Sequence, residues 1–414
     1  MTEKSDNLNG KNSIIINKVS LYPIRTPRIS GDASQHVLIR LDTDSGIIGV
    51  GEYADITDLP LTMTDLEDLE KSFSNVLCGQ NAMEISRLDH LFSLLLTGRG
   101  DIGIYTGSLR AGFEMALHDI AGKALDVPVY VLFGGPVRTK IKVCMPIFRN
   151  LNEKHVEQNL ALIERLLGEG FDNFRLYIGG APDFDEVFLS ALREQMSDRI
   201  TMQAFDLSNH VHATDCVRLI NRMRKYYEPQ YVESITPLYD VRGMAEARAK
   251  LDIPVSEHVG DSRHAIALWE ARAVDIINVA NSAHGGMRES LKVFAVAETL
   301  GLRTILSTTQ ETSLGTAAQA HVGAAVLNIH YPTVAIGPKL YTEDPARNPI
   351  RYSAGYMLVP EGPGLGIELD WDKVQALHYK IGWRDYEIDH CVPDIHNTVW
   401  KVNLTTGLQG VRKK

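Results

Sequence analysis

The sequence predicts an α/β fold in which a (β/α) barrel carries a smaller α+β domain. The chain has 414 residues, enough for one barrel of roughly 250 residues and a second unit. After Gly135, apolar strand-like runs alternate with helix-length patterns, which is typical of parallel α/β folds. Before Gly135, strands come first and helices follow, which is typical of an α+β unit.

Residues 1–135 are predicted to form this N-terminal α+β unit. Alternating strands run over residues 13–25 and 35–53, and Asp44-Ser45-Gly46 supplies a turn inside the second stretch. Apolar residues then recur at helical spacing from about 60 to 125, and Asp126-Val127-Pro128 ends the last helix.

Residues 136–365 are predicted to form the barrel, and residues 366–414 to return and cover the first domain. The barrel stretch holds eight strand candidates separated by helix-length patterns, and eight such units close a barrel. The candidates cover residues 141–148, 171–178, 200–205, 230–234, 252–257, 274–280, 303–308 and 333–337.

The composition is that of a cytoplasmic enzyme. A net charge of −10 and a pI near 5.8 argue against nucleic acid or anionic membranes as partners. The four cysteines are scattered without a CxxC pair, so neither a disulfide framework nor a zinc site is expected. The polar N-terminus lacks the apolar run of a signal peptide, and no segment has the length of a membrane span.

Three acidic residues stand where predicted strands give way to loops. Asp206, Glu233 and Glu257 are separated by 27 and 24 residues, about one βα unit each. Three consecutive parallel strands would therefore bring them together at the C-terminal end of the barrel. Oxygen-only ligands favour Mg²⁺ over zinc or copper. A single acidic residue at a strand end could stand there by chance, but three in phase predict a magnesium site.

The chain resembles the enolase superfamily, in the branch of mandelate racemase and muconate lactonizing enzyme. The resemblance rests on the three carboxylates, the Gly-Ile-Ile-Gly-Val-Gly-Glu run at 46–52, the helix ending at Gly135, and the run that ends in Gly285-Gly286. It implies a capping domain over a modified (β/α)₈ barrel, a small carboxylate substrate, a homo-oligomer, and Mg²⁺ held by the three carboxylates. Glu257 is preferred to His258 as the third ligand because its position on the strand is expected to point its side chain into the barrel.

That superfamily abstracts the proton next to a carboxylate, and this chain departs from its usual bases. Arg175-Leu176-Tyr177 stands in place of Lys-x-Lys, and Ala280 and Thr308 occupy the positions of the bases on the opposite face. A racemase needs acid–base groups on both faces of the substrate carbon, so a lyase is favoured.

Tyr177 is the predicted base, with Arg175 and the metal lowering its pKa. The pair is similar to that of the D-mannonate dehydratase group, although Ser208 replaces a histidine of that group. Packing or substrate binding is the alternative role for the pair.

Other residues at the predicted mouth of the barrel could have catalytic or structural roles. His258 could donate a proton to a leaving hydroxyl or be a solvated neighbour of the ligands. Gln310 and Glu311 could bind substrate hydroxyls or cap the next helix. Arg28 and Arg99 lie in segments that form specificity loops in the family, but surface solvation explains either one equally well. Asp261 could orient His258 or cap a helix, and His284 could make local hydrogen bonds.

The sequence thus predicts a Mg²⁺-dependent lyase that dehydrates a small hydroxy acid or acid sugar to a 2-keto acid. Two alternatives stay open. One is a cycloisomerase or epimerase of a carboxylate substrate, and the other is a metal-binding barrel without catalysis.

Overall fold

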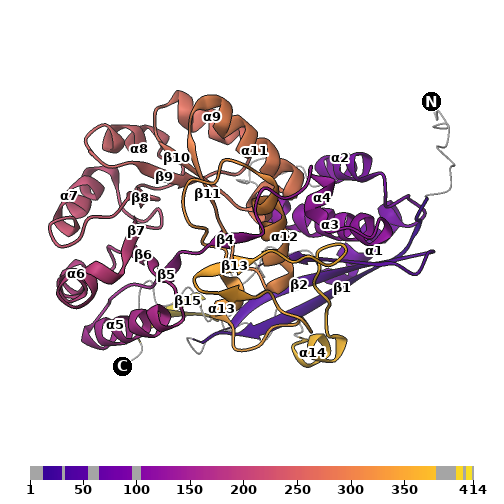
Figure 1. Cartoon of the computed structure of the whole chain (residues 1–414), viewed down its shortest axis with the longest axis horizontal. Coiled ribbons are helices and arrows are strands. Elements are labelled where there is room, and N and C mark those ends of the chain that lie inside the picture. Colours follow the sequence, from indigo (N-terminus) through magenta and orange to yellow (C-terminus); the bar gives the residue numbers. More distant parts are fainter. Residues whose placement is uncertain are drawn as a thin grey trace.

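The computed structural model describes residues 13–29, 33–54, 65–95, 104–378, 398–403 and 407–412. The N-terminal unit opens with an antiparallel sheet of order β1-β2-β3, followed by helices that pack on it, as predicted (Figure 1). Its elements are β1 (Ile16–Pro27), β2 (Ala33–Thr43), β3 (Ile48–Tyr53), α1 (Leu66–Leu77), α2 (Ile85–Leu95), α3 (Ile104–Ala124) and α4 (Val129–Leu132).

The glycines of the Gly46–Glu52 run have a packing reason. Strand β3 lies so close to α3 that a Cβ added at Gly51 would overlap the carbonyl oxygen of Gly112. A Cβ at Gly112 would in turn meet the backbone of Glu52. Only glycine permits this approach of two backbones, and it places Glu52 at the junction with the barrel.

Seven parallel strands curl into the barrel sheet, in the order β11-β10-β9-β8-β7-β6-β5. The strands are β5 (Met145–Ile147), β6 (Asn173–Tyr177), β7 (Thr201–Asp206), β8 (Tyr231–Glu233), β9 (Val255–His258), β10 (Ile276–Val279) and β11 (Arg303–Leu306). Helices lie between and after these strands (Figure 1). The helices are α5 (Glu153–Gly168), α6 (Pro182–Met196), α7 (Ala213–Met223), α8 (Val241–Arg248), α9 (Ser262–Glu270), α10 (Asn281–His284), α11 (Met287–Leu300), α12 (Ser313–Ala325) and α13 (Gly337–Leu340).

The predicted barrel with its cap is confirmed, but the first and last strand candidates differ from expectation. The stretch 141–148 is divided between β4 (Lys140–Lys142) and β5, and β4 joins a small separate sheet with β12 (Tyr352–Ser353) and β13 (Tyr356–Leu358). The stretch 333–337 forms only an isolated parallel bridge between Thr333 and Val143. Its backbone still connects the two edges of the sheet, since Val334 N donates to Leu306 O and Cys144 N donates to Thr333 O.

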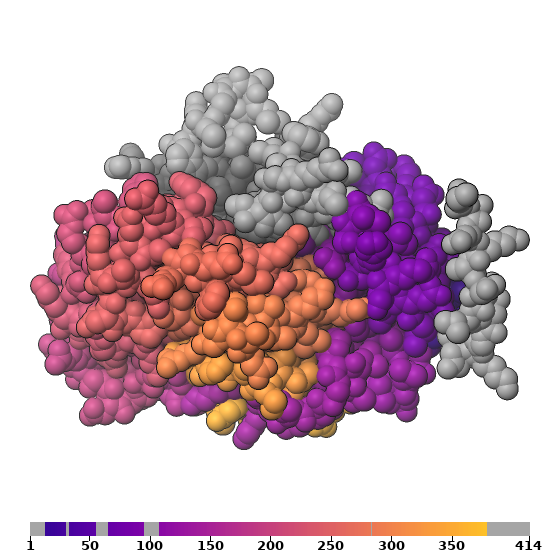
Figure 2. Space-filling model, turned by 90° about the horizontal axis from the view of Figure 1, so that it is seen from above, coloured from indigo at the N-terminus to yellow at the C-terminus, as the bar shows by residue number. Residues whose placement is uncertain are grey.

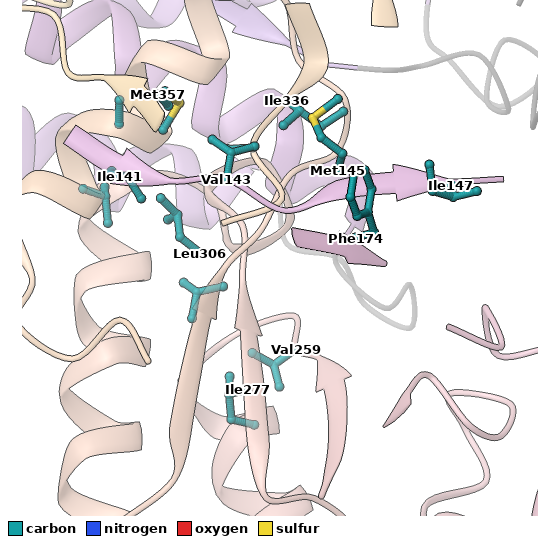
Figure 3. Close-up of a cluster of buried hydrophobic side chains, with 14 of the residues drawn as sticks. Ile141, Val143, Met145, Ile147, Phe174, Val259, Ile277, Leu306, Ile336 and Met357 are labelled. Carbon is teal, nitrogen blue, oxygen red and sulfur yellow. The ribbon is translucent and has the colours of Figure 1, made fainter. Parts of the chain in front are cut away.

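Side chains alternate between two cores, as the period of a strand requires. The outward residues pack against the helices in one large apolar cluster, part of which includes Phe174, Ile277 and Leu306 (Figure 3). A small inner cluster fills the barrel, consisting of Ala204, Tyr231, Ile276 and Ile305. Membership of one cluster or the other therefore reports which way a strand residue faces.

The capping unit and the barrel are in direct contact, as Figure 2 shows for the purple and orange parts of the surface. Buried Glu52 of β3 accepts hydrogen bonds from Thr312 N (2.9 Å), Thr312 Oγ1 (2.7 Å) and Gly315 N (2.8 Å) at the start of α12. Its other partner is His36 Nδ1 at 2.9 Å. We call this group, Glu52 with His36 and Thr312, the cap clamp.

The chain returns to the capping sheet after the barrel, as predicted. In α14 (Trp371–Ala376), the Trp371 ring lies 5.1 Å from that of Tyr22, and Arg25 N donates to Leu377 O. Farther on, β14 (Thr398–Asn403) and β15 (Gly407–Arg412) pair with each other. Within the described ranges, no helix combines the length and apolar character that crossing a membrane requires.

Candidate active site

Four predicted residues meet at the C-terminal ends of β6, β7 and β8. The sheet register aligns Tyr177 with Asp206 and Asp206 with Glu233, so these three side chains leave the sheet on the same side. Arg175 is aligned with Ala204 of the inner cluster and therefore also faces inward. This grouping follows from strand periodicity, as the sequence predicted.

Arg175 is the electrostatic centre of this group. Its Nη1 donates to Glu233 Oε1 in a very short contact and lies 3.5 Å from Asp206 Oδ2. Its Nη2 lies 2.5 Å from the Tyr177 hydroxyl oxygen. Burial alone would raise the pKa of the Glu233 carboxyl, but Arg175 and His258 lower it to about 2. Burial and the Glu233 charge instead raise the pKa of Asp206.

The prediction that Glu257 points into the barrel is wrong, because the register of β9 is shifted by one residue from the expected one. Glu233 is aligned with Ser256, and Glu257 is aligned with Ile277. Ile277 and Val259 lie together in the outer apolar cluster (Figure 3), and Val255 belongs to the same cluster. Residues 255, 257 and 259 thus share the outer face.

His258 occupies the inward position instead. Its Nε2 lies 3.2 Å from Glu233 Oε1, and its side chain is 37% exposed. Burial lowers the pKa of His258, but the hydrogen bond and charge of Glu233 outweigh that and raise it overall. The ring is therefore positioned by a buried carboxylate and remains accessible from the mouth.

The residues present do not form the oxygen-only Mg²⁺ site that the sequence predicted. Asp206 and Glu233 adjoin, but both oxygens of Glu257 are engaged elsewhere. Glu257 Oε2 accepts from Asn209 Nδ2 (2.8 Å), and Oε1 accepts from Ser234 Oγ (3.0 Å) and His258 N (2.8 Å). In the described part of the chain, no group of three or more His, Cys, Asp or Glu side chains has an arrangement that could hold a metal ion.

Tyr177 lies inside the site, where Arg175 alone does not give its hydroxyl the pKa of a base. Its ring stacks on Phe148 with 5.6 Å between centroids. Burial raises the pKa of Tyr177 to about 12, and the nearby Arg175 offsets only part of that effect. Arg175 alone therefore does not bring this pKa into a useful range, and the predicted joint effect of Arg175 and a metal stays a prediction. The hydroxyl is protonated at neutral pH and is suited to donate a hydrogen bond.

The opposite face of the barrel mouth carries no free acid or base at the two expected positions. Ala280 is buried at the start of α10, and its N donates to His284 Nε2 at 3.1 Å, a local bond of the kind predicted for His284. Thr308 donates from Oγ1 to Glu311 in a very short contact. Glu311 is fully buried and also accepts from Ser282 Oγ at 2.9 Å and Thr309 N at 3.0 Å.

The remaining predicted site residues are placed as follows. Asp261 caps α9 by accepting from His264 N at 2.8 Å, the alternative given for it. Gln310 has a φ of 66°, and its buried Oε1 lacks a hydrogen-bond partner. Arg28 is buried after β1 and donates from Nε to Ser34 Oγ at 2.7 Å. Arg99 lies outside the described residues.

Two residues that the sequence did not single out lie among these side chains. Arg149 follows β5, is buried, and lies 5.6 Å from the Tyr177 ring centroid. Asn278 is the register partner of His258 on β10. Arg149 stands directly after the first strand candidate, at the end where barrel enzymes place functional groups, so position could have revealed it. Asn278 lies inside an apolar strand, where a buried asparagine is itself a signal.

Comparison with known proteins identifies the family. Residues 11–134 match the family described as mandelate racemase / muconate lactonizing enzyme, N-terminal domain, and residues 159–373 match the enolase C-terminal domain-like family. A muconate cycloisomerase from Pseudomonas fluorescens has the same fold, with a TM-score of 0.79 at 24% identity over 89% of this chain and 100% of that one. Members of this branch generally use Mg²⁺.

Relatives with different named reactions are similarly distant. A D-xylonate dehydratase from Haloferax volcanii is 28% identical over 87% of this chain and 89% of its own length. An N-succinyl-L-Arg/Lys racemase from Bacillus cereus is 25% identical over 87% of this chain and 97% of its own length. A muconate cycloisomerase from Rhodococcus opacus is 28% identical over 64% of this chain and 71% of its own length. The chain therefore belongs to the enolase superfamily, in its mandelate racemase / muconate lactonizing enzyme branch.

Proposed function

We propose that this protein is a lyase that removes the proton next to a carboxylate and eliminates water from a small hydroxy acid or acid sugar. The C2–H and C3–O bonds break, a C2=C3 double bond forms, and the resulting enol tautomerises to a 2-keto acid. The observation that carries the proposal is the His258–Glu233 pair on the inner face of the barrel. A dehydratase is also among the relatives.

His258 is proposed to act as both base and acid. Glu233 is buried and accepts from the imidazole, so it fixes the ring and stabilises the imidazolium that forms when the substrate proton is taken. The same proton then goes to the departing hydroxyl, which leaves as water. One group suffices when the proton and the hydroxyl lie on the same face of the substrate.

The residues on the opposite side of the barrel mouth also favour a reaction that uses only one face of the substrate. Racemisation at C2 needs a second acid–base group there, and Ala280 cannot supply one. Glu311 is fully buried and already accepts hydrogen bonds from Ser282 and Thr309. Elimination needs no second base, so it agrees better with these residues than racemisation does.

The charge that develops on the substrate carboxylate needs donors. Arg175 carries a permanent charge, and the protonated Tyr177 hydroxyl lies 2.5 Å from it. Buried nitrogens without a partner include Arg175 Nε and Asn278 Nδ2. Donors that are fixed before the reaction stabilise the doubly charged enediolate more than the singly charged carboxylate of the ground state, which is the useful direction for catalysis.

A cycloisomerase is the second candidate. Lactone formation also needs a proton on only one face, and a muconate cycloisomerase shares the fold. The two reactions differ in product, because a lactone forms without loss of water.

The test is a screen of the purified full-length protein against acid sugars, small hydroxy acids and unsaturated diacids, with and without added Mg²⁺. We expect 2-keto acid from at least one hydroxy acid, abolished in His258→Asn and kept in His90→Asn, whose residue is exposed on α2. A lactone product would favour the cycloisomerase. No turnover by a folded protein would contradict both and favour a barrel without catalysis.

A further inference from the structure

We infer that the Arg175 guanidinium takes the place of a divalent cation at the Asp206–Glu233 pair, so that this member of the family does not load Mg²⁺. The inference goes beyond the proposed function, because metal binding can be measured without any substrate. It rests on the charges, the third ligand position and the unpaired atoms of the site.

The charges at the site are already balanced by protein groups. Asp206 and Glu233 are 4% and 1% exposed, and neighbouring strands bring them side by side. Arg175 Nη1 contacts both carboxylates, and His258 contacts Glu233. An arginine cannot lose its proton in a protein. A divalent cation between the carboxylates would therefore lie beside a fixed positive charge, at low dielectric, where repulsion is strong.

The third ligand position has changed as well. Ser256 and His258 are the inward residues of β9, whereas Glu257 lies on the outer face with Val255 and Val259. Bringing Glu257 inside would require a one-residue slip of β9, and such a slip turns every side chain of a strand to the other face. The two buried valines would then leave the apolar cluster. The hydrogen bonds from Asn209 and Ser234 to Glu257 would be lost with them.

The oxygens of the three predicted ligands are already paired within the protein. A metal site without its ion is expected to leave buried oxygens without partners. Among the described residues, no buried oxygen of Asp206, Glu233 or Glu257 lacks a hydrogen-bond partner. The unpaired buried atoms on the inward-facing residues of β6 and β10 are donors instead, Arg175 Nε and Asn278 Nδ2. Such atoms accommodate an anionic oxygen, as in a substrate carboxylate.

The test is a titration of the full-length protein with Mn²⁺, followed by calorimetry and by the electron paramagnetic resonance signal of free Mn²⁺. After dialysis against a chelator, we expect no saturable Mn²⁺ binding in the wild type. We also expect the same melting temperature in Mg²⁺ as in a sodium salt of equal ionic strength. One equivalent of bound Mn²⁺ that Asp206→Asn abolishes would overturn the inference.

A variant tests the role of the guanidinium directly. Arg175→Gln removes the charge between the carboxylates, so Mn²⁺ should bind this variant more tightly than the wild type. Arg149→Gln is the matched control, since Arg149 is also buried beside Tyr177; it should raise Mn²⁺ affinity less than loss of Arg175, which contacts both carboxylates. Equal or weaker Mn²⁺ binding by Arg175→Gln would contradict the inference. Substrate turnover is not read in either experiment, so failure here is distinct from failure of the proposed lyase activity.

Discussion

His258 Nε2 lies 3.2 Å from Glu233 Oε1, across the ends of two adjacent barrel strands. The carboxylate is 1% exposed and the imidazole 37% exposed, so a buried anion orients an accessible ring. Carboxylate–histidine pairs of this kind fix the tautomer and stabilise the protonated ring.

His258→Gln should therefore lower kcat by about 10²- to 10⁴-fold, the range for loss of a general acid–base group. The glutamine keeps a polar side chain near Glu233, so folding should be preserved. Steady-state kinetics on the acid found in the screen, with circular dichroism as the folding control, gives the answer. Activity within a few-fold of the wild type would mean that another residue is the base.

Tyr177→Phe should weaken stabilisation of the charge that develops on the substrate carboxylate, without removing the base. Because the pKa of Tyr177 is raised to about 12 by burial, its hydroxyl stays protonated and contributes one hydrogen bond, about 1 kcal/mol. We expect kcat/KM to fall roughly 5- to 10-fold. Complete loss of kcat with unchanged KM would restore Tyr177 as the base.

The cap clamp should contribute strongly to stability. Glu52→Ala removes the carboxylate that binds His36 Nδ1 and the Thr312 N–H, and breaking such a buried pair costs about 3–5 kcal/mol. Denaturant unfolding measures the loss. Glu368→Ala is the control: its side chain is 71% exposed, and its free energy of unfolding should change by less than about 0.5 kcal/mol. Equal stability of both variants would show that the clamp does not hold the two parts together.

Acid should destabilise the protein in part through His321. Burial lowers the pKa of His321 in the folded state to about 4, and its Nε2 donates to Leu365 O. An unfolded histidine has a pKa near 6.5, so the unfolded state binds the proton first. Stability from this group is full above about pH 6.5 and is lost as the pH falls towards about 4, by up to about 3 kcal/mol.

Unfolding free energies of the wild type and His321→Gln, measured across this pH range, check the effect. The wild type should lose more stability than the variant between pH about 6.5 and about 4. His90→Gln, at an exposed position, should follow the wild type. A parallel pH dependence in the wild type and His321→Gln would contradict the assignment.

Strand periodicity predicted much of the site because its residues obey a simple rule. Arg175 and Tyr177 are two residues apart on one strand, and Asp206 and Glu233 end the next two strands. Such positions converge whatever the details of packing. The same reasoning gave the order of elements, with the exceptions of the divided first strand and the bridge at Thr333.

The errors came from properties that a single sequence does not contain. Whether Glu257 or His258 faces inward depends on a one-residue choice of register, and the short interval after Pro254 was the only sign of the shift. The pKa of Tyr177 depends on burial against the charge of Arg175, a balance set by the folded surroundings. The error in register favoured a site of three carboxylates over one in which His258 stands beside Glu233.

The most direct test of one-sided elimination is proton NMR of the wild-type protein acting on its acid substrate in D₂O. We predict loss of the C2 proton signal as product forms, while unreacted substrate keeps its configuration at C2. The opposite configuration at C2 of recovered substrate would show a second acid–base group on the other face and would contradict the account.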